Sequence, residues 1–224
     1  MGKLKIECLQ KKLKLKKLAK AVYTVLGQTA NLKAELVFEA SSDMTELNRS
    51  SRGVNSVTDV LSFPSLDGIR GEVLQRDKCN TELDGKYIFI GSIVLCEAQI
   101  RSQAAELGHS EEAERDYLII HGLMHLMGYD HLTPSDKKEM REKEKAAVAY
   151  LAQIDKKYAK LVAEDNENAE NAENNDKNAN ADSAENGVYE KTNENISDVI
   201  PDETAESLGS VKPVGADGKT GDER

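Results

Sequence analysis

Residues 121–131 read HGLMHLMGYDH and contain three of the four histidines in the 224-residue chain. On a helix, residues four apart lie on one face with their Cβ atoms roughly 5–6 Å apart, so His121 and His125 can reach one metal ion. Gly128 can adopt the left-handed backbone that ends a helix, which allows the chain to double back and bring His131 to the same ion. The spacing therefore predicts one zinc ion (Zn2+) bound by His121, His125 and His131.

The predicted site is of the catalytic type, because three protein ligands leave a fourth position for water. The spacing of the histidines equals that of the metzincin proteases, whose general base is a glutamate directly after the first histidine. Here that position is Gly122. A zinc protease needs this carboxylate to take a proton from the attacking water, so the sequence argues against a metalloprotease. The fourth histidine, His109, lies outside the cluster beside Gly108 and is interpreted as a loop or cap residue.

The segments around this stretch predict an α+β fold, with a helix and strands first and helices later. Strands are expected over residues 32–39, 58–63 and 87–96, the last of them central because it is almost continuously apolar. Residues 65–86 are expected to form a loop or hairpin. Helical segments are predicted over 9–27, 43–47 and 97–107, from the cap residue Ser110 to about Met127, and from the cap residue Thr133 through Leu161.

The negative charge of the chain is concentrated in its C-terminal part. The formal net charge is −10, of which residues 164–224 contribute −12 and residues 1–163 contribute +2. The acidic segment has few large apolar side chains and cannot bury enough apolar surface to offset the entropy of ordering its backbone. We therefore expect a folded domain over residues 1–163 and a disordered, acidic, low-complexity tail over residues 164–224. The tail is interpreted as a solubilising spacer, with an interaction tail as the alternative.

The cysteines and the apolar runs indicate a cytoplasmic protein. Cys8, Cys79 and Cys96 are odd in number and have no C-x-x-C spacing, which favours a reducing compartment. No stretch approaches the roughly 18 apolar residues of a membrane helix, and six lysines interrupt residues 9–26, where a signal peptide would be apolar. These lysines can contact nucleic acid or a membrane surface, or form the solvated face of a helix that packs on the core.

Two blocks of the sequence resemble the YbeY family of zinc-dependent endoribonucleases. They are HGLMHLMGYDH (121–131) and LNRSSRGVNSVTDVLSFP (47–64), and Met140 and Glu142 also fit the family's downstream helix. The resemblance covers about residues 30–155 and leaves the acidic tail outside. It implies a zincin-like single domain with a mixed sheet of about four strands flanked by helices.

The resemblance also implies a function in ribosomal RNA maturation and ribosome quality control. The expected activity is zinc-dependent cleavage of single-stranded ribosomal RNA. The small ribosomal subunit and its assembly factors are the expected partners, and no DNA or membrane partner is expected. A ribosome assembly factor whose metal is mainly structural is the alternative, and a metalloprotease is the less favoured one.

Arg52 carries over from the family as the catalytic residue that faces the scissile phosphate. Phosphodiester hydrolysis builds negative charge on phosphoryl oxygens, and a guanidinium can bind two of them at once. The alternative for Arg52 is a loop salt bridge or a solvated charge. Arg49 lies nearby but outside the matched position.

Three further positions bear on the expected site. Asp59 is interpreted as a capping or structural residue at the edge of a strand, and Asp130 as a residue that orients the neighbouring ligand His131. The family usually has Gly-Asp-Ile in its central strand, whereas this chain has serine at the middle position, Ser92. If that aspartate orients a ligand or a water molecule, Ser92 can form a hydrogen bond but supplies no charge.

Overall fold

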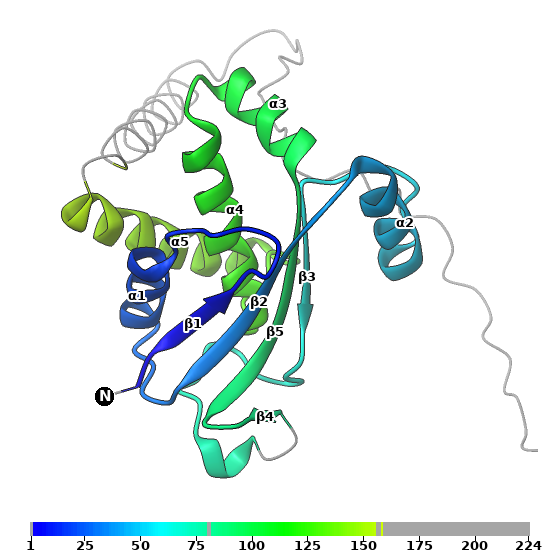
Figure 1. The fold of residues 1–224 in the computed structure, drawn as a ribbon. Helices are drawn as coiled ribbons and strands as arrows, with labels where there is room; N and C mark the ends of the chain where they lie inside the picture. Colours follow the sequence, from blue (N-terminus) through cyan, green and yellow to red (C-terminus); the bar gives the residue numbers. More distant parts are fainter. Residues whose placement is uncertain (1, 80–81, 156–157, 159–224) are drawn as a thin grey trace, which may run out of the picture. The chain divides into compact units, whose positions relative to one another are not determined.

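A mixed β-sheet with helices on both faces forms the described part of the computed structural model, which comprises residues 2–79, 82–155 and 158 (Figure 1). The strands are β1 (Leu4–Glu7), β2 (Leu32–Glu39), β3 (Val60–Pro64), β4 (Leu83–Asp84) and β5 (Tyr87–Cys96). The helices are α1 (Lys16–Val25), α2 (Ser41–Arg52), α3 (Glu97–Leu107), α4 (Glu111–Leu126) and α5 (Pro134–Ile154), with a short 3₁₀-helix at Arg76–Lys78. The predicted α+β class is confirmed, and the sheet has five strands instead of about four. The predicted tail over residues 164–224 lies outside the described residues.

The strand order of the sheet is β1-β2-β5-β3, and β4 pairs with the start of β5. β1 is parallel to β2, and β2 is parallel to β5. β3 and β4 are both antiparallel to β5. The apolar segment 87–96 is therefore a central strand, as predicted, because only a strand covered on both faces needs such a sequence.

The two faces of β5 pack against different helices. Successive side chains of a strand point to opposite faces. Ile93 and Leu95 belong to the main core, which also contains the buried residues of α1, α4 and α5. Val94 and Cys96 instead pack with Met44 of α2 in a smaller core. It follows that α2 lies on one face of the sheet and α4 on the other, as the ribbon shows (Figure 1).

The predicted helix over residues 9–27 is wrong in its first part, because α1 begins only at Lys16. The chain starts instead with β1, and the segment between β1 and α1 is held beside the end of β2. The side chain of Gln10 donates a hydrogen bond to the carbonyl of Phe38 (2.9 Å) and accepts one from the Phe38 N–H (2.7 Å). This pairing with the backbone of β2 keeps the segment out of a helix, although its leucines have helical spacing.

The predicted helical turn over residues 43–47 is too short, since α2 continues to Arg52. Met44 and Asn48 are one helical turn apart and both are buried. The side-chain amide of Asn48 donates to the carbonyl of Ser56 at 2.9 Å, which fixes the chain that follows the helix. Gly53 ends α2 in the left-handed conformation with φ 73°. Arg52 therefore lies in the last turn of a helix and not in a loop.

α3 and α4 begin and end where the sequence predicts, whereas α5 begins as predicted but ends at Ile154 and not at Leu161, because Asp155 has an extended backbone. Gly108 ends α3 with a left-handed backbone. Ser110 Oγ accepts a hydrogen bond from the Ala113 N–H at 3.1 Å, and Thr133 Oγ1 accepts one from the Asp136 N–H at 3.2 Å. Both caps position α4 and α5, the two helices that build the site. Among the described residues, no helix is both long and apolar enough to cross a bilayer.

Candidate metal centre

Three histidines converge at the C-terminal end of α4. His121 and His125 lie on the last turns of α4, and His131 lies in the loop that follows. The Nε2 atoms of His121 and His125 are 3.1 Å apart, and one ring nitrogen of each of the three histidines lies within 4.8 Å of the others. Nitrogens bound to one tetrahedral zinc ion at 2.0–2.1 Å are about 3.3 Å apart. The cluster therefore fits a single divalent metal, and it is the one such group among the described residues.

The turn that returns the chain to the metal ligands depends on Gly128. Its φ is 81°, and its N–H donates to the carbonyl of His125 at 2.9 Å. A Cβ atom at this position would lie 2.0 Å from the carbonyl oxygen of Ile69. Glycine is therefore required both for the backbone angle and for the close approach of the loop that contains Ile69. The predicted turn between His125 and His131 is confirmed.

Glu144 of α5 orients the first histidine. Its Oε1 lies 2.7 Å from His121 Nδ1, and its Oε2 accepts a hydrogen bond from the Tyr117 hydroxyl at 3.4 Å. The carboxylate is buried, with only 4% of the residue exposed. An acceptor on Nδ1 keeps the proton on that nitrogen and leaves Nε2 free to bind a metal.

Glu144 is not among the site residues predicted from the sequence, although the sequence contains a signal for it. Along α5 the residues Met140, Glu144, Val148 and Leu151 follow helical spacing and are all buried. An acidic residue within an apolar helical stripe needs a buried partner, because a buried carboxylate without one is costly. The partner is His121, which the sequence alone does not place beside α5.

His125 is held in the neutral form that a metal requires. Its Nδ1 lies 3.0 Å from the carbonyl oxygen of Tyr129, which accepts a hydrogen bond from this nitrogen. Burial lowers the pKa of His125 to about 4, and the positive charges that His121 and His131 carry when protonated contribute to this lowering. At neutral pH the imidazole is therefore unprotonated at Nε2, as a metal ligand must be.

Asp130 acts on the third histidine through the backbone. Its Oδ1 accepts a hydrogen bond from the His131 N–H at 2.7 Å, which fixes the start of the loop after the turn. This contact supports the interpretation of Asp130 as a residue that orients His131.

Gly122 faces the sheet and not the histidine cluster. A Cβ atom on Gly122 would lie 2.9–3.0 Å from three side-chain atoms of Ile93. The close contact between α4 and β5 leaves no room for a glutamate, the residue that serves as general base in the zinc proteases of this spacing. The geometry thus supports the argument against a metalloprotease.

Arg52 is not in contact with the histidines in the part of the chain that the structure describes. It is exposed at the end of α2, on the face of the sheet opposite α4, and β3 is the edge strand of the sheet. The guanidinium of Arg52 makes no hydrogen bond or ion pair with any described residue. The neighbouring Arg49 differs, because both of its Glu46 contacts are short, 3.0 Å from Nε and 2.6 Å from a terminal nitrogen. A salt bridge as the alternative role is therefore observed for Arg49 and not for Arg52.

Ser92 lies on the α2 face of the sheet. Ser92 precedes Ile93 in β5, so their side chains point to opposite faces of the sheet, and Ile93 faces α4. In the sheet, Ser92 pairs with Phe63 of β3. Its side chain therefore points away from the face on which α4 carries the histidines.

Asp59 and His109 have structural partners. Asp59 Oδ1 accepts from the Val60 N–H at 2.7 Å, and Oδ2 accepts from the side-chain amide of Gln103 at 3.0 Å, so the predicted structural role at the start of β3 is confirmed. His109 lies between the α3 cap and the α4 cap, as predicted. Its side chain is also buried, with Nε2 2.5 Å from Glu114 Oε2.

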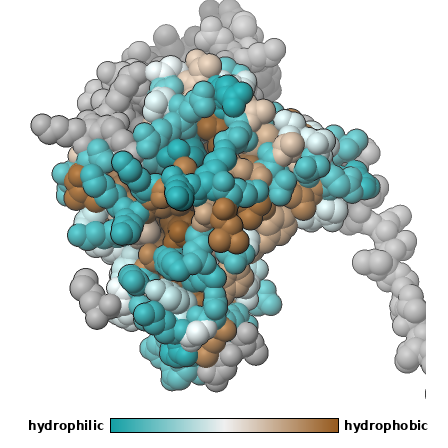
Figure 2. Space-filling view, in the orientation of Figure 1, coloured by the Kyte–Doolittle hydropathy of each residue, from teal (hydrophilic) through white to brown (hydrophobic). Residues whose placement is uncertain are grey.

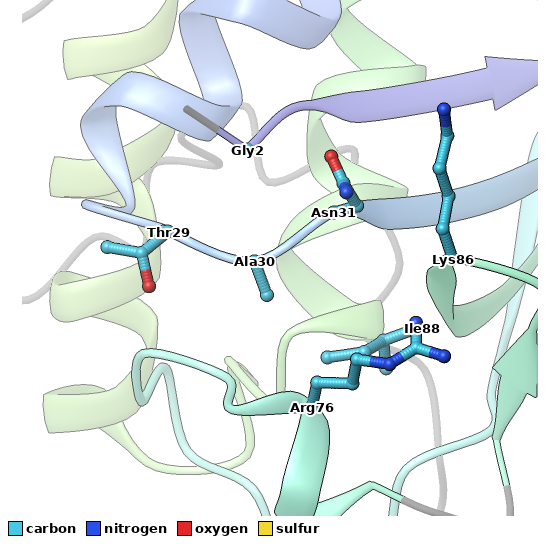
Figure 3. A pocket seen from close by; sticks show the side chains of 7 residues that line it. All are labelled: Gly2, Thr29, Ala30, Asn31, Arg76, Lys86 and Ile88. Atoms are coloured by element: carbon cyan, nitrogen blue, oxygen red, sulfur yellow. The ribbon is translucent and has the colours of Figure 1, made fainter.

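The described surface includes two cavities of similar volume in different places. One of about 280 Å³ lies between the start of β1 and the loop after α1, and contains none of the three histidines (Figure 3). Its lining includes Arg76 and Lys86. The other, of about 330 Å³, is lined by Gly128, Tyr129 and Asp130, the residues that connect the second and third histidines. Space for a ligand is therefore available next to the candidate metal centre.

Comparison with models of known protein families identifies one that matches most of this chain. The model of the endoribonuclease YbeY family matches residues 3–152, a span that includes all three histidines, Glu144 and Arg52. The chain belongs to the YbeY family.

Two endoribonuclease YbeY proteins from Clostridium agree with this assignment. An endoribonuclease YbeY from Clostridium perfringens strain SM101 is 34% identical over 146 residues, which is 61% of this chain and 86% of the relative. The corresponding protein from Clostridium kluyveri is 39% identical over 115 residues, or 49% of this chain and 70% of the relative. A solution structure of a Thermotoga maritima protein is 26% identical, with a TM-score of 0.43, and covers 67% of this chain and 89% of that protein.

Proposed function

We propose that this YbeY-family chain is a zinc-dependent endoribonuclease that cleaves single-stranded RNA in ribosomal RNA maturation and ribosome quality control. The observation that carries the proposal is the convergence of three imidazole nitrogens within 4.8 Å of one another in a chain of this family. The three histidines are half-buried, and three nitrogen ligands would leave the fourth position of a zinc ion for water, as in catalytic zinc sites.

The protein's own contribution is to hold the ligands in one protonation state and one geometry. A bound zinc ion supplies Lewis-acid chemistry, lowering the pKa of a water ligand to about 7 and polarising a phosphoryl oxygen. Glu144 and the carbonyl of Tyr129 each hold a proton on Nδ1 of one histidine, so that the Nε2 atoms face the same point. Gly128 sets the distance at which His131 joins them.

In this proposal Arg52 binds the substrate and stabilises the charge that develops on the phosphoryl oxygens. Its support is the family resemblance together with the exposed guanidinium, which no described residue neutralises. Because α2 and α4 lie on opposite faces of the sheet, this role requires the Arg52 side chain to reach the scissile phosphate around the edge strand β3.

The cellular setting completes the proposal. The substrate is ribosomal precursor RNA, and the partners are the small ribosomal subunit and its assembly factors, in the cytoplasm. The folded domain comprises residues 1–163, with residues 164–224 as an acidic tail.

The test compares cleavage of ribosomal precursor RNA by the wild type and by His125→Ala. The proposal expects cleavage by the wild type, abolished by a chelator and restored by zinc, and no cleavage by the variant at an unchanged thermal midpoint measured without metal. A wild type that binds ribosomal particles but does not cut RNA contradicts the nuclease proposal. That result favours an assembly factor with a structural metal.

A further inference from the structure

The N-terminal segment of the chain has charge of a single sign. Residues 8–34 contain seven lysines and no acidic residue. Three of these lysines are neutralised by acids from other segments. The pairs are Lys11 with Glu97, Lys17 with Asp155, and Lys33 with Glu7 and Asp84.

The other four lysines form an exposed surface, which we call the lysine surface: Lys12, Lys14, Lys16 and Lys20. None of the four makes an ion pair with a described residue. Their positions are nonetheless fixed, because Leu15 and Leu18 between them are buried in the main core. Lys16 and Lys20 are four residues apart on α1 and therefore lie on the same side of the helix.

A comparison with α5 shows that the lysine surface is not an ordinary solvated helix face. On α5 the exposed bases Lys138 and Arg141 are each followed by an exposed acid, Glu139 and Glu142. Mixed charges of this kind are typical of a surface that only contacts solvent. In the orientation of Figures 1 and 2, α1 lies on the visible side, and hydrophilic side chains cover that part of the face.

We propose that the lysine surface binds phosphates of the RNA substrate at a distance along the strand from the cleaved bond. The inference rests on the proposed function, in which the ligand is a polyanion, and it assigns the lysine surface a share of RNA affinity. Lysines neutralise phosphates as point charges without reading sequence. Since α1 contributes no residue to the histidine cluster, the lysine surface raises affinity and leaves the chemical step alone.

An anionic membrane fits the observations less well than RNA. A helix that lies on a membrane inserts its apolar face among the lipids. The apolar face of α1 is already packed, with Leu18 and Val22 1% exposed. Only Leu9 offers a large exposed apolar side chain in this segment.

The test removes three charges from the lysine surface in the full-length chain. The variant is Lys14→Gln/Lys16→Gln/Lys20→Gln. The matched control, Lys78→Gln/Lys86→Gln/Arg101→Gln, removes three exposed cations that have acidic neighbours in Asp77, Asp84 and Glu111. Binding of a 30-nucleotide single-stranded RNA is titrated at several salt concentrations, and single-turnover cleavage is measured at saturating RNA.

The lysine variant is expected to bind about tenfold to a hundredfold more weakly at low salt. The slope of the logarithm of the RNA association constant against the logarithm of the salt concentration should become shallower by about 2. Each phosphate contact on a single strand contributes about 0.7 to this slope, and three lysines are removed. The cleavage rate at saturating RNA should not change, and the control should bind nearly as the wild type does.

Equal binding by the lysine variant and the control overturns the inference. The inference is also overturned if the lysine variant retains RNA binding but no longer binds vesicles that contain 30% anionic lipid. That result would assign the lysine surface to membranes. If the wild type binds RNA but does not cleave it, the proposed nuclease function fails. The inference about the lysine surface is still tested, because the binding comparison does not require cleavage.

Discussion

At the scale of single residues, the site depends on how each histidine is oriented. The cluster of three histidines is predictable from sequence because all three fall within eleven residues of one helix and one turn. Glu144 is not, because it lies 23 residues from His121 and its role depends on how α5 packs on α4. A buried acid in an apolar stripe shows that a partner exists but not which residue it is.

Glu144→Gln should weaken metal binding by about 10–100-fold, the usual effect of losing a partner that orients a metal ligand. The amide is nearly isosteric but removes the negative charge beside His121. The measurement is a competition titration of metal-free protein with a chelator of known affinity. Glu142→Gln, two residues away on the same helix and exposed, is the control and should bind metal as the wild type does. Equal metal affinity in both variants would show that Glu144 has no orienting role.

Arg52→Ala should leave folding and metal content unchanged while cleavage falls roughly 10²–10³-fold, the scale for losing one charge-stabilising donor. Arg52→Lys should restore only part of the rate, because an ammonium cannot make the planar two-pronged contact. Binding of RNA should weaken less than the rate. The measurement is single-turnover cleavage of single-stranded RNA beside a binding titration at the same salt.

Arg49→Ala is the control for this prediction, because Arg49 lies one turn away and is already paired with Glu46. Its rate should stay close to that of the wild type. If Arg52→Ala cuts as fast as Arg49→Ala, Arg52 has no part in the reaction.

At the scale of elements, the turn after α4 joins the fold to the site. Gly128→Ala places a methyl group 2.0 Å from the carbonyl oxygen of Ile69 and strains the backbone at φ 81°. The unfolding free energy should fall by about 1–2 kcal/mol for the backbone conformation and by about 1–3 kcal/mol more for the overlap. Metal affinity should fall as well, because relief of the overlap displaces His131 from the other two histidines.

Gly108→Ala separates these two costs. Gly108 has φ 71° at the end of α3, and a Cβ atom added there would meet no surrounding atom within 4 Å. This variant should show the conformational cost alone, with unchanged metal affinity, in denaturant unfolding and chelator competition. A Gly128→Ala protein no less stable than Gly108→Ala would contradict the account of the turn.

The elements themselves were predictable where local signals decide them. Ser110, Thr133 and Gly108 are cap residues, and α4 and α5 begin, and α3 ends, where these residues predict. The errors lie where distant contacts decide. Gln10 binds the backbone of β2 and prevents a helix, and the burial of Asn48 extends α2 through a polar stretch that reads as a loop. Neither hydrogen bond can be predicted from the residues that surround Gln10 or Asn48 in the sequence.

At the scale of the whole molecule, the part of the chain that the structure describes supplies both cores, as far as Tyr158. A chain that ends at Ala163 should keep its thermal midpoint and its metal content, because residues 164–224 have too few large apolar side chains to extend the core. Thermal unfolding and elemental analysis of this truncation, beside the full chain, check the prediction. A loss of several degrees would show that residues 164–224 stabilise the domain.

In the proposed function, three histidines hold one divalent metal that the chain uses to cleave RNA. The most direct test adds zinc stepwise to metal-free protein and follows bound metal and RNA cleavage in the same samples. Bound zinc and RNA cleavage should saturate together at about one equivalent of zinc per chain. The double variant His121→Ala/His125→Ala should bind no zinc at this site and should not cleave RNA. Full cleavage by the metal-free protein, or full metal occupancy in the double variant, would contradict the claim.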